Sequence, residues 1–567
     1  MTMRRVIRSV AAAAALAVVL VACAGIPRSG TVEVGDVIVS EDNPEIDILS
    51  RGPEKDALQE EILRGFVDAA ASPQDRYATA REFLTPSFSR EWDPDAGVTI
   101  DKEASRSYSV TGENSMVLTL TPAADVDAAG VFDVPDSTAS VPLGYEFEQV
   151  DGQWRIRKAP PGIVLGEPTF GLVFGSYPLY FYDPSFTYLV PEVRWFPRRT
   201  STPTQIVKEL LKGPSTWLKG AVVSAFLDGT KLSSDSVQVV ARNAQVDLNG
   251  EALQTELINL QRMQLQLSAS LSSVSAISDV TISTDQIDQQ IPKITVNPPI
   301  KDPHVDSRSL VLRDGQFGFL APTANTVAPI VGLSDAIVAI EPSAVTLGSR
   351  QASAAALGQD GVYSVRAGSG AQLVDLRRGL IQPAIDDFGY VWSVPADAPG
   401  ELFVYAQDGT ATHVETHWPD ATRIISLDVS RDGTRVVALY QAGDTTRFVA
   451  AAVLRGDGEK RNAPQSLGGS VTLATGAGVP SDAAWVDELT VASLTALPSG
   501  ETQVTTQQLG GLSASIEGTP GGVTIAGGNS VRELRILTRT GELELRRGGG
   551  WQERINGVSM LGTQQGS

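Results

Sequence analysis

Cysteine occurs once in this chain of 567 residues, at Cys23, and its position constrains everything that follows it. Arg4, Arg5 and Arg8 precede a run of small apolar residues over 10–22, and Cys23 follows that run directly. A basic start, an apolar stretch of roughly 7–15 residues and small residues before a cleavage point are typical of a secretory signal peptide. Because about 20 apolar residues are needed to cross a bilayer core, this stretch is too short to be a membrane span. We therefore predict an exported chain that is cleaved before Cys23.

The quartet Leu20-Val21-Ala22-Cys23 resembles a bacterial lipobox. In such signals the cysteine thiol receives a diacylglycerol, the preceding peptide is removed, and acyl chains such as palmitate hold the protein at the membrane. Since each buried CH₂ group contributes ~0.8 kcal/mol, two or more chains anchor a protein stably. The resemblance implies a signal peptide over 1–22, lipidation at Cys23, and a protein anchored by lipid on the extracytoplasmic face of the cell membrane. The alternative is a plain secretory signal with a cysteine at the cleavage point by chance.

The chain is strongly acidic. Its 45 basic and 66 acidic side chains give a formal net charge of −21 at pH 7, and removal of 1–22, with three arginines and no acid, makes it about −24. Binding to a phosphate backbone needs clusters of lysine and arginine, so we expect no nucleic-acid partner. Without a second cysteine no intramolecular disulfide can form, and the fold must be stabilised by burial of its cores.

Length and composition predict several folded domains. Hydrophobic residues make up 42% and charged residues 20% of the chain, as is ordinary for globular proteins. A chain of this length exceeds a single hydrophobic core. The predicted divisions are a signal peptide 1–22, a lipidated tether 23–50, a first α+β domain 51–165, a second α+β domain 166–300 and an all-β domain 301–567.

In the first domain, two helices are predicted before a sheet. Apolar residues recur at helical spacing over 55–71, and Ser72-Pro73 has the form of the cap and first position of a second helix. Asp151-Gly152 separates two alternating runs, which is a strong hairpin signal. Two helices followed by such a sheet resemble the cone-shaped fold of the nuclear transport factor superfamily. The second helix would bury Tyr77, Ala80 and Leu84.

A dense group of aromatic residues follows the first domain. Its members are Tyr177, Tyr180, Phe181, Tyr182, Phe186 and Tyr188. Clustered large aromatic side chains are usually buried, so we interpret them as a contact that joins one domain to the next. The alternative is an exposed aromatic platform for a ligand.

The second domain alternates helices and strands. A helix begins after Ser201 and ends at Gly213. The remaining predicted elements are paired strands at 237–240 and 245–248, a helix over 250–271 and a strand at 280–282.

The last domain changes to short strands between glycine turns. Asp-Gly or Thr-Gly turns followed by a strand begin at 360, 408, 432 and 540. The segment Ser430-Arg431-Asp432-Gly433 leads into an apolar strand and resembles a propeller turn of the TolB type. At about 40–45 residues per blade, a β-propeller of about six blades fits the length, and circular repetition removes exposed sheet edges. A pair of β-sandwiches is the alternative.

One segment is distinctive enough to indicate a family. It combines residues 179–184 (LYFYDP) with 188–195 (YLVPEVRW) and the downstream 207–214 (VKELLKGP). This segment resembles the GerMN module of the LpqB lipoproteins of actinobacteria. The order of signal, α+β unit, GerMN-like unit and propeller also agrees over nearly the whole chain. The resemblance implies a multidomain fold of α+β and all-β domains.

The resemblance also implies a role. LpqB lipoproteins are associated with the extracytoplasmic sensor domain of the histidine kinase MtrB, whose response regulator is MtrA, in a two-component system that affects the cell wall and division. We therefore expect an accessory protein, not an enzyme, that binds a sensor histidine kinase and modulates its signalling. No catalytic residue, cofactor or metal is implied, and Cys23 is the one expected modified site. The alternatives are an envelope glycan-binding protein or hydrolase that uses the propeller channel, and a scaffold without a signalling role.

Two polar groups could in principle carry chemistry. His413, Glu415 and His417 would share one face of a strand, but the two histidines would then lie ~13 Å apart, too far for one metal ion. We predict a solvated strand face there. Asp386 and Asp387 are adjacent acids that would point to opposite sides of a strand, and we interpret them as solvated turn residues and not as a catalytic pair.

Overall fold

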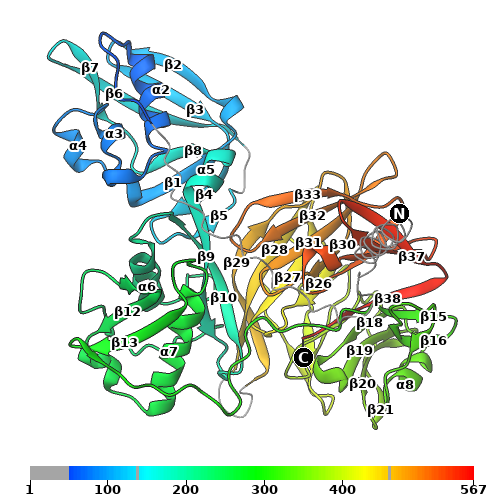
Figure 1. Ribbon diagram of the computed structural model, residues 1–567. Helices are drawn as coiled ribbons and strands as arrows, with labels where there is room; N and C mark the ends of the chain where they lie inside the picture. The colour runs from blue at the N-terminus through cyan, green and yellow to red at the C-terminus, as the bar shows by residue number, and fades with distance from the viewer. Residues whose placement is uncertain (1–49, 136–138, 457–461, 567) are drawn as a thin grey trace, which may run out of the picture. The chain divides into compact units, whose positions relative to one another are not determined.

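The computed structural model describes residues 50–135, 139–456 and 462–566, which all belong to one unit, Glu45–Ser567 (Figure 1). Elements α2 to α5 form a first domain, β9 to β14 a second, and β15 to β38 a third. Within this described part, no helix is both long and apolar enough to cross a membrane.

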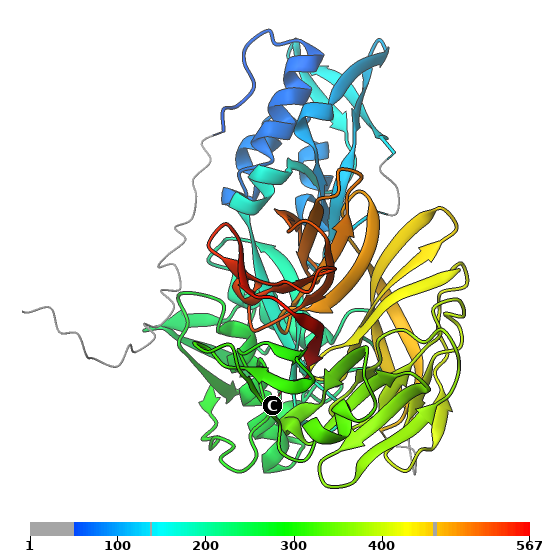
Figure 2. The ribbon, with the colours of Figure 1, turned by 90° about the vertical axis from the view of Figure 1, so that its right-hand side faces the viewer.

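Helix α2 (Gln59–Ala69) begins the first domain inside the predicted range 55–71. The backbone N–H of Leu58 donates to Glu61 Oε2 at 2.7 Å, which satisfies one of the unpaired donors at the helix start. The apolar face of the helix packs against β7 and β8, and Figure 2 shows α2 running along one side of the strands. Its buried residues are Ile62, Leu63, Phe66, Val67 and Ala69.

The prediction of a second long helix after Ser72 is wrong. Residues 75–77 have φ angles of 45°, 56° and 61°, a left-handed backbone that interrupts a right-handed helix. The chain instead forms a 3₁₀ turn over Gln74–Arg76 and a single helical turn, α3 (Ala78–Arg81). The side chains predicted to face inward, Tyr77, Ala80 and Leu84, are nevertheless buried. The apolar pattern therefore predicted burial correctly and the backbone incorrectly.

Two four-stranded sheets, β5-β4-β1-β8 and β2-β3-β6-β7, complete the first domain together with α4 (Phe88–Glu91) and α5 (Glu167–Val173). The turn at Asp151-Gly152 has φ angles of 52° and 74° and joins β6 to β7, which confirms the predicted hairpin. The likeness to the nuclear transport factor superfamily stays a prediction. The strands are β1 (Gly97–Asp101), β2 (Ser107–Gly112), β3 (Ser115–Leu120), β4 (Pro122–Asp127), β5 (Phe132–Asp133), β6 (Val141–Val150), β7 (Gln153–Lys158) and β8 (Ile163–Gly166).

A long ribbon of two antiparallel strands, β9 (Phe174–Tyr182) and β10 (Leu189–Pro197), begins the second domain. Helix α6 (Thr202–Lys212) follows where the sequence predicted it. It ends at Gly213, whose φ of 93° is a conformation that glycine adopts without strain.

A strand–helix–strand unit completes the second domain. Strands β12 (Asn243–Leu248) and β13 (Asp279–Thr284) pair in parallel, and α7 (Leu257–Leu271) connects them. Strands β11 (Gln238–Val240) and β14 (Ile287–Asp288) pair antiparallel at the two edges. The predicted helix over 250–271 is too long, because its first four residues form a separate 3₁₀ turn.

Over the described residues, the third domain consists of four antiparallel sheets of four strands and one sheet of eight strands. Four have the orders β22-β23-β24-β25, β26-β27-β28-β29, β30-β31-β32-β33 and β34-β35-β36-β37, and a larger sheet has the order β17-β16-β15-β38-β18-β19-β20-β21. One short helix, α8 (Ser334–Val338), lies after β17. The strands are β15 (Leu310–Arg313), β16 (Gln316–Leu320), β17 (Val327–Ala328), β18 (Ala344–Leu347), β19 (Ser353–Gly358), β20 (Gly361–Arg366), β21 (Gly370–Asp375), β22 (Ala384–Ile385), β23 (Val391–Ser393), β24 (Phe403–Tyr405), β25 (Ala411–His413), β26 (Arg423–Val429), β27 (Arg435–Ala442), β28 (Thr445–Arg455), β29 (Pro464–Leu473), β30 (Val479–Trp485), β31 (Thr490–Ala496), β32 (Thr502–Gln508), β33 (Ser513–Glu517), β34 (Gly522–Ala526), β35 (Arg535–Thr538), β36 (Leu543–Arg547), β37 (Gly550–Ile555) and β38 (Val558–Gln564).

The first strands of successive sheets contact one another. These contacts join β18 to β22, β22 to β26, β26 to β30, β30 to β34 and β34 to β38. Strand β38 then pairs antiparallel with β15 and in parallel with β18, and Figure 1 shows the red β38 beside these green strands. The series of contacts therefore returns to the strand from which it began.

Candidate functional site

The aromatic residues of the β9–β10 ribbon join it to the third domain. The hydroxyl of Tyr180 donates to Glu488 Oε1 at 2.8 Å, and Trp195 Nε1 donates to the carbonyl of Gly510 at 2.6 Å. Four of the six predicted rings are buried, and Tyr177 and Phe186 are partly buried, so the open platform is not formed and the interpretation as a contact between domains is confirmed. At most 2% of the surface is exposed in Tyr180, Phe181, Tyr182 and Tyr188.

The predicted propeller turn at 430–434 is a buried centre of hydrogen bonds. The carboxylate of Asp432 accepts from Ser430 Oγ at 2.8 Å and from the backbone N–H of Thr434 at 2.9 Å, and it also bonds with the Thr434 hydroxyl and the Arg435 guanidinium. Burial raises the pKa of Asp432, but Arg435 and these hydrogen bonds outweigh it, so the pKa lies below its ordinary value. Gly433 supplies the φ of 70° that the turn requires.

Arg435 links this turn to the second domain by a hydrogen bond. Its side chain is fully buried, and Nη1 donates to the carbonyl of Pro191 in β10 at 3.3 Å. Nη2 donates to the carbonyl of Glu488 at 3.0 Å, and the guanidinium lies 5.1 Å from the ring centre of Trp485. A single guanidinium thus connects two sheets of the third domain with the ribbon.

Arg431 connects the same turn to the segment before the third domain. Its Nη1 donates to the carbonyl of Pro303 at 2.9 Å. Its Nη2 donates to the carbonyl of Val486 at 3.0 Å and to that of Gly528. Burial lowers the pKa of Arg431, since its partners are mainly backbone carbonyls and not a paired carboxylate. The turn therefore holds two sheets and the linking chain together.

A groove of 630 Å³, here called the three-domain groove, lies where the three domains meet. Its walls come from β4 and β5 with the turn between them, Arg194 of β10, Glu209 and Lys212 of α6, residues 213–217, and Ser470 and Val471 of β29. Lys212 is exposed in it and pairs with Glu209 at 2.7 Å. All three domains contribute residues to this groove.

A buried ion pair supports the three-domain groove. Arg194 Nη2 lies 2.9 Å from Glu192 Oε2, and only 3% of either side chain is exposed. Arg194 Nη1 donates to the carbonyl of Ala129 in the first domain at 3.0 Å, and the backbone N–H of Ser215 donates to Glu192 at 3.2 Å. Glu192 Oε1, Arg194 Nε and Ser215 Oγ are buried without a hydrogen-bond partner. An unpaired buried polar atom costs ~1–3 kcal/mol, so this arrangement is held by its surroundings.

Two carboxylates join the first strands of adjacent sheets. Asp428 of β26 accepts from the backbone N–H of Trp485 at 3.2 Å, and Asp482 of β30 accepts from that of Ile525 at 2.9 Å. Burial raises the pKa of Asp428 to about 7, with a further contribution from Asp482, and raises the pKa of Asp482 to about 6. The hydrogen bonds from the backbone N–H groups lower both pKa values, but burial has the larger effect. Each carboxylate thus links one sheet to the next and titrates near neutral pH.

His413, Glu415 and His417 are exposed, as predicted, but only His413 lies in a strand. His413 Nε2 bonds to the carbonyl of Gly400 at 3.0 Å. Over 50–135, 139–456 and 462–566, no group of three or more His, Cys, Asp or Glu side chains is placed to hold a metal ion.

The interpretation of Asp386 as a solvated turn residue is wrong. Only 1% of its surface is exposed, and it pairs with Arg455 at 2.9 Å and accepts from Trp392 Nε1 at 3.3 Å. Asp387 is partly exposed and shares a hydrogen bond with Tyr188 of the second domain. Both acids follow β22 and do not lie in a strand, and both have structural partners.

Cys23, the predicted lipidation site, lies outside the described residues. The sequence placed Arg431 in a turn but did not reveal that Arg431 and Arg435 connect domains. Prediction from the sequence also missed a group of arginines at 532–554, although an arginine-rich stretch in an acidic chain was a visible signal.

Comparison with known families assigns the domains. The description "Lipoprotein LpqB, N-terminal domain" matches residues 52–171, and "Lipoprotein LpqB beta-propeller domain" matches 318–560. The chain belongs to the LpqB family of lipoproteins. Between these two regions, residues 178–289 of this LpqB-family protein match "Sporulation and spore germination", the GerMN-type domain. The resemblance predicted from the sequence is confirmed, and the third domain is of the propeller type.

Named relatives agree with this assignment. Lipoprotein LpqB of Bifidobacterium longum is 33% identical over 44% of this chain and 46% of its own length, so the match spans about half of that relative. LpqB of Cutibacterium acnes is 29% identical over 49% of this chain and 47% of its own. LpqB of Streptomyces avermitilis is 24% identical over 76% of this chain and 78% of its own. No enzymatic name occurs among these three.

Two solved structures were also similar. The first GerMN domain of the sporulation protein GerM from Bacillus subtilis is 21% identical, with a TM-score of 0.18, over 22% of this chain and 93% of that chain. A putative TolB from Agrobacterium tumefaciens is 12% identical, with a TM-score of 0.28, over 39% of this chain and 83% of that chain. The domain assignment rests on the family matches.

Proposed function

We propose that this LpqB-family protein is a lipid-anchored accessory protein on the extracytoplasmic face of the cell membrane. Acyl chains on Cys23 would anchor it, and its folded part would bind the sensor domain of a membrane histidine kinase of the MtrB type. Binding would modulate two-component signalling that affects the cell wall and division. The protein acts in this proposal by contact and not by catalysis.

The observation that carries the proposal is the three-domain groove with the buried bonds around it. Arg194 bonds to the first domain, and Arg435 bonds the ribbon of the second domain to the third. A surface composed from domains that are already fixed to each other loses little conformational entropy when a partner binds. Anchoring in the same membrane as the partner raises the effective concentration, so a modest interface suffices.

The propeller in this proposal has six blades, closed by β38. Support comes from the contacts of the first strands, which run from β18 through β22, β26, β30 and β34 to β38 and back to β18. Closure of this kind combines strands from both ends of the domain in one sheet.

The test is a binding measurement between the lipoprotein and the isolated sensor domain, with both proteins in one bilayer and at low salt. Lys212→Glu in the three-domain groove should weaken binding about tenfold, as expected for a charge reversal inside an interface. Lys208→Glu is the matched control, because Lys208 is an exposed lysine of the same helix that does not line the groove. Absence of binding at low salt would refute the proposal, and equal loss in both variants would remove the groove from it.

A further inference from the structure

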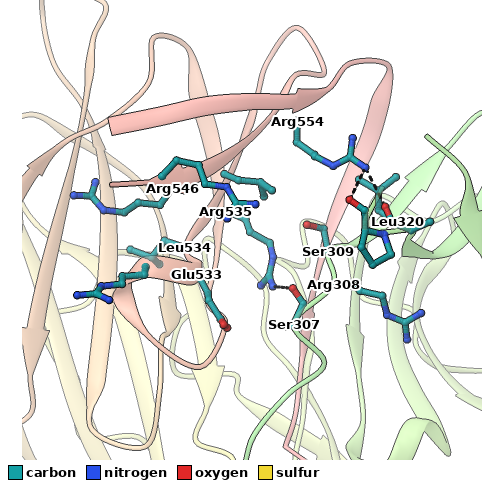
Figure 3. A pocket seen from close by; sticks show the side chains of 14 residues that line it. Ser307, Arg308, Ser309, Leu320, Glu533, Leu534, Arg535, Arg546 and Arg554 are labelled. Atoms are coloured by element: carbon teal, nitrogen blue, oxygen red, sulfur yellow. Dashed lines mark hydrogen bonds between the residues drawn. The ribbon is translucent and has the colours of Figure 1, made fainter. Parts of the chain in front are cut away.

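An arginine-rich cavity, here called the arginine cavity, lies inside the third domain and has a volume of 280 Å³ (Figure 3). It is formed by residues 532–535, β36 and Arg554 on one side and by residues 307–309 and 320–322 on the other. Among the residues that line the cavity, all of which lie in the described part of the chain, Glu533 is the single carboxylate. The cavity is therefore positively charged, although the whole chain, with 66 acidic and 45 basic residues, is negatively charged. The arginines are Arg308, Arg532, Arg535, Arg546, Arg547 and Arg554.

Two of these arginines are fixed by backbone carbonyls. Figure 3 shows Arg535 donating to the carbonyl of Ser307, a bond of 2.6 Å, and Arg554 donating to the carbonyls of Ala321 and Pro322. Carbonyl oxygens orient a guanidinium but do not neutralise its charge. Burial lowers the pKa of Arg535, and the nearby Arg431 acts in the same direction, although Glu533 partly offsets both. Backbone carbonyls therefore orient these two guanidinium groups without neutralising them.

Three further arginines face the cavity without a carboxylate partner. Arg308 is different, because it pairs with Asp306 at 2.5 Å and turns away from the cavity in Figure 3. In the described part of the chain, no ion pair or side-chain hydrogen bond to protein is made by Arg532, Arg546 or Arg547. Arg546 is partly buried, whereas Arg532 and Arg547 are exposed at the rim.

Arg546 supplies the most specific signal. Its Nη1 atom is buried and has no hydrogen-bond partner, and its guanidinium lies 5.7 Å from the ring centre of Trp551. A buried charged donor without an acceptor is costly, and native structures rarely retain one without a reason. An acceptor that arrives with a ligand would satisfy this atom.

Geometry and charge select the chemistry of that ligand. A guanidinium offers planar pairs of N–H donors that match the oxygens of a phosphate or a carboxylate. A phosphate monoester, whose second pKa is about 6, carries nearly two negative charges at pH 7, so it offsets several guanidinium groups better than one carboxylate. We propose that the arginine cavity binds a phosphate group, with Arg546 as the central contact and Arg532 and Arg547 at the rim.

The test measures binding to the full lipoprotein in detergent at low salt by calorimetry. The probes are inorganic phosphate and pyrophosphate, glycerol phosphodiester as a fragment of a phosphodiester polymer, and citrate as the carboxylate counterpart. Saturable binding of pyrophosphate that weakens as salt is added is the expected result. Binding of the monoester-type anions alone would assign a free phosphate compound, and binding of the diester as well would assign a polymer.

Three variants locate the site. Arg546→Gln should weaken pyrophosphate binding at least about tenfold, since a charge-assisted hydrogen bond is lost. The double change Arg532→Gln and Arg547→Gln should also weaken it about tenfold, and both residues are exposed, so folding is not at risk. Arg378→Gln is the matched control: it removes an exposed arginine outside the cavity.

Specific outcomes overturn the proposal. They are the absence of saturable binding by phosphate and pyrophosphate, equal affinities of wild type and the double variant, or tighter binding of citrate than of pyrophosphate. None of these measurements involves a kinase. The phosphate site can therefore be refuted without refuting the proposed function, and the reverse also holds.

Discussion

Tyr180 of the ribbon donates its hydroxyl proton to Glu488 of the third domain, across 308 positions of sequence, at 2.8 Å. Burial raises the pKa of the Tyr180 phenol, and the adjacent Glu488 raises it further, so the phenol stays a donor over the whole physiological range. Burial likewise raises the pKa of Glu488. The bond therefore couples two groups that both sit in a poorly solvated contact between domains.

Removing this donor should loosen the contact. Tyr180→Phe leaves Glu488 partly buried with one partner fewer, and we expect a loss of about 1–3 kcal/mol in the free energy of unfolding. Thermal unfolding followed by calorimetry measures it. Tyr363→Phe serves as the control, because the Tyr363 hydroxyl bonds to Asp360 at 3.3 Å at an exposed position. A loss of the same size in the control would show that the Tyr180 bond has no special weight.

The ion pair inside the 430–435 turn should be strongly coupled. Arg435→Met leaves the carboxylate of Asp432 buried without its cation, and we expect a loss of about 3–5 kcal/mol. Adding Asp432→Asn to Arg435→Met removes the uncompensated charge and should recover part of that loss. A double-mutant cycle from urea unfolding measures the coupling. Strictly additive losses would contradict the assigned pairing.

The carboxylates between sheets should make stability depend on pH. The pKa values of Asp428 and Asp482 are about 7 and about 6 in the folded protein, above that of an unfolded chain. Between roughly pH 4, the aspartate pKa of an unfolded chain, and pH 7, the folded state holds protons that the unfolded state has released. Their contribution to stability is therefore largest in acid and is lost as the pH rises through this window.

Asparagine at both positions keeps an acceptor for the N–H donors and removes the titration. The change in the free energy of unfolding between about pH 5 and pH 8 should be smaller in the Asp428→Asn, Asp482→Asn variant than in wild type. Urea titrations at both pH values measure the difference. Identical pH profiles would show that neither carboxylate titrates in this window.

Cys23→Ala should release the protein from the membrane. Without its thiol the chain has no site for the acyl chains, so it should remain an uncleaved precursor or appear in the medium, with its folded domains unchanged. Cell fractionation and mass spectrometry of the N-terminus measure this outcome. Ser29→Ala, in the same predicted tether, is the control and should stay anchored. A Cys23→Ala variant as firmly anchored as wild type would contradict lipidation.

Local signals in the sequence predicted local structure well. Asp151-Gly152 forms its hairpin, and α6 ends at Gly213, because the conformations needed there are encoded by the residues themselves. The left-handed backbone at 75–77 was not visible, since none of those residues is a glycine. Predicting the burial of Asp386 requires Arg455, which approaches it only when two sheets pack.

The candidate sites show the same limit. The arginine cavity combines Arg308 with residues from 532 to 554, and the three-domain groove combines strands from all domains. The sequence showed the arginines that form the arginine cavity and the aromatic residues that lie beside the three-domain groove, but not that they come together. Their juxtaposition depends on how the sheets of the third domain and the ribbon pack together, which periodicity does not reveal.

Strand β38 has a consequence for biosynthesis. Translation delivers β15 and β18 more than two hundred residues before β38, the strand that fits between them. Until then each keeps an unpaired edge, the kind of surface on which nascent chains associate with each other. The pairing of this domain therefore waits for a strand made late, and a chain that stops before residue 558 exposes two unpaired strand edges to chaperones or proteases.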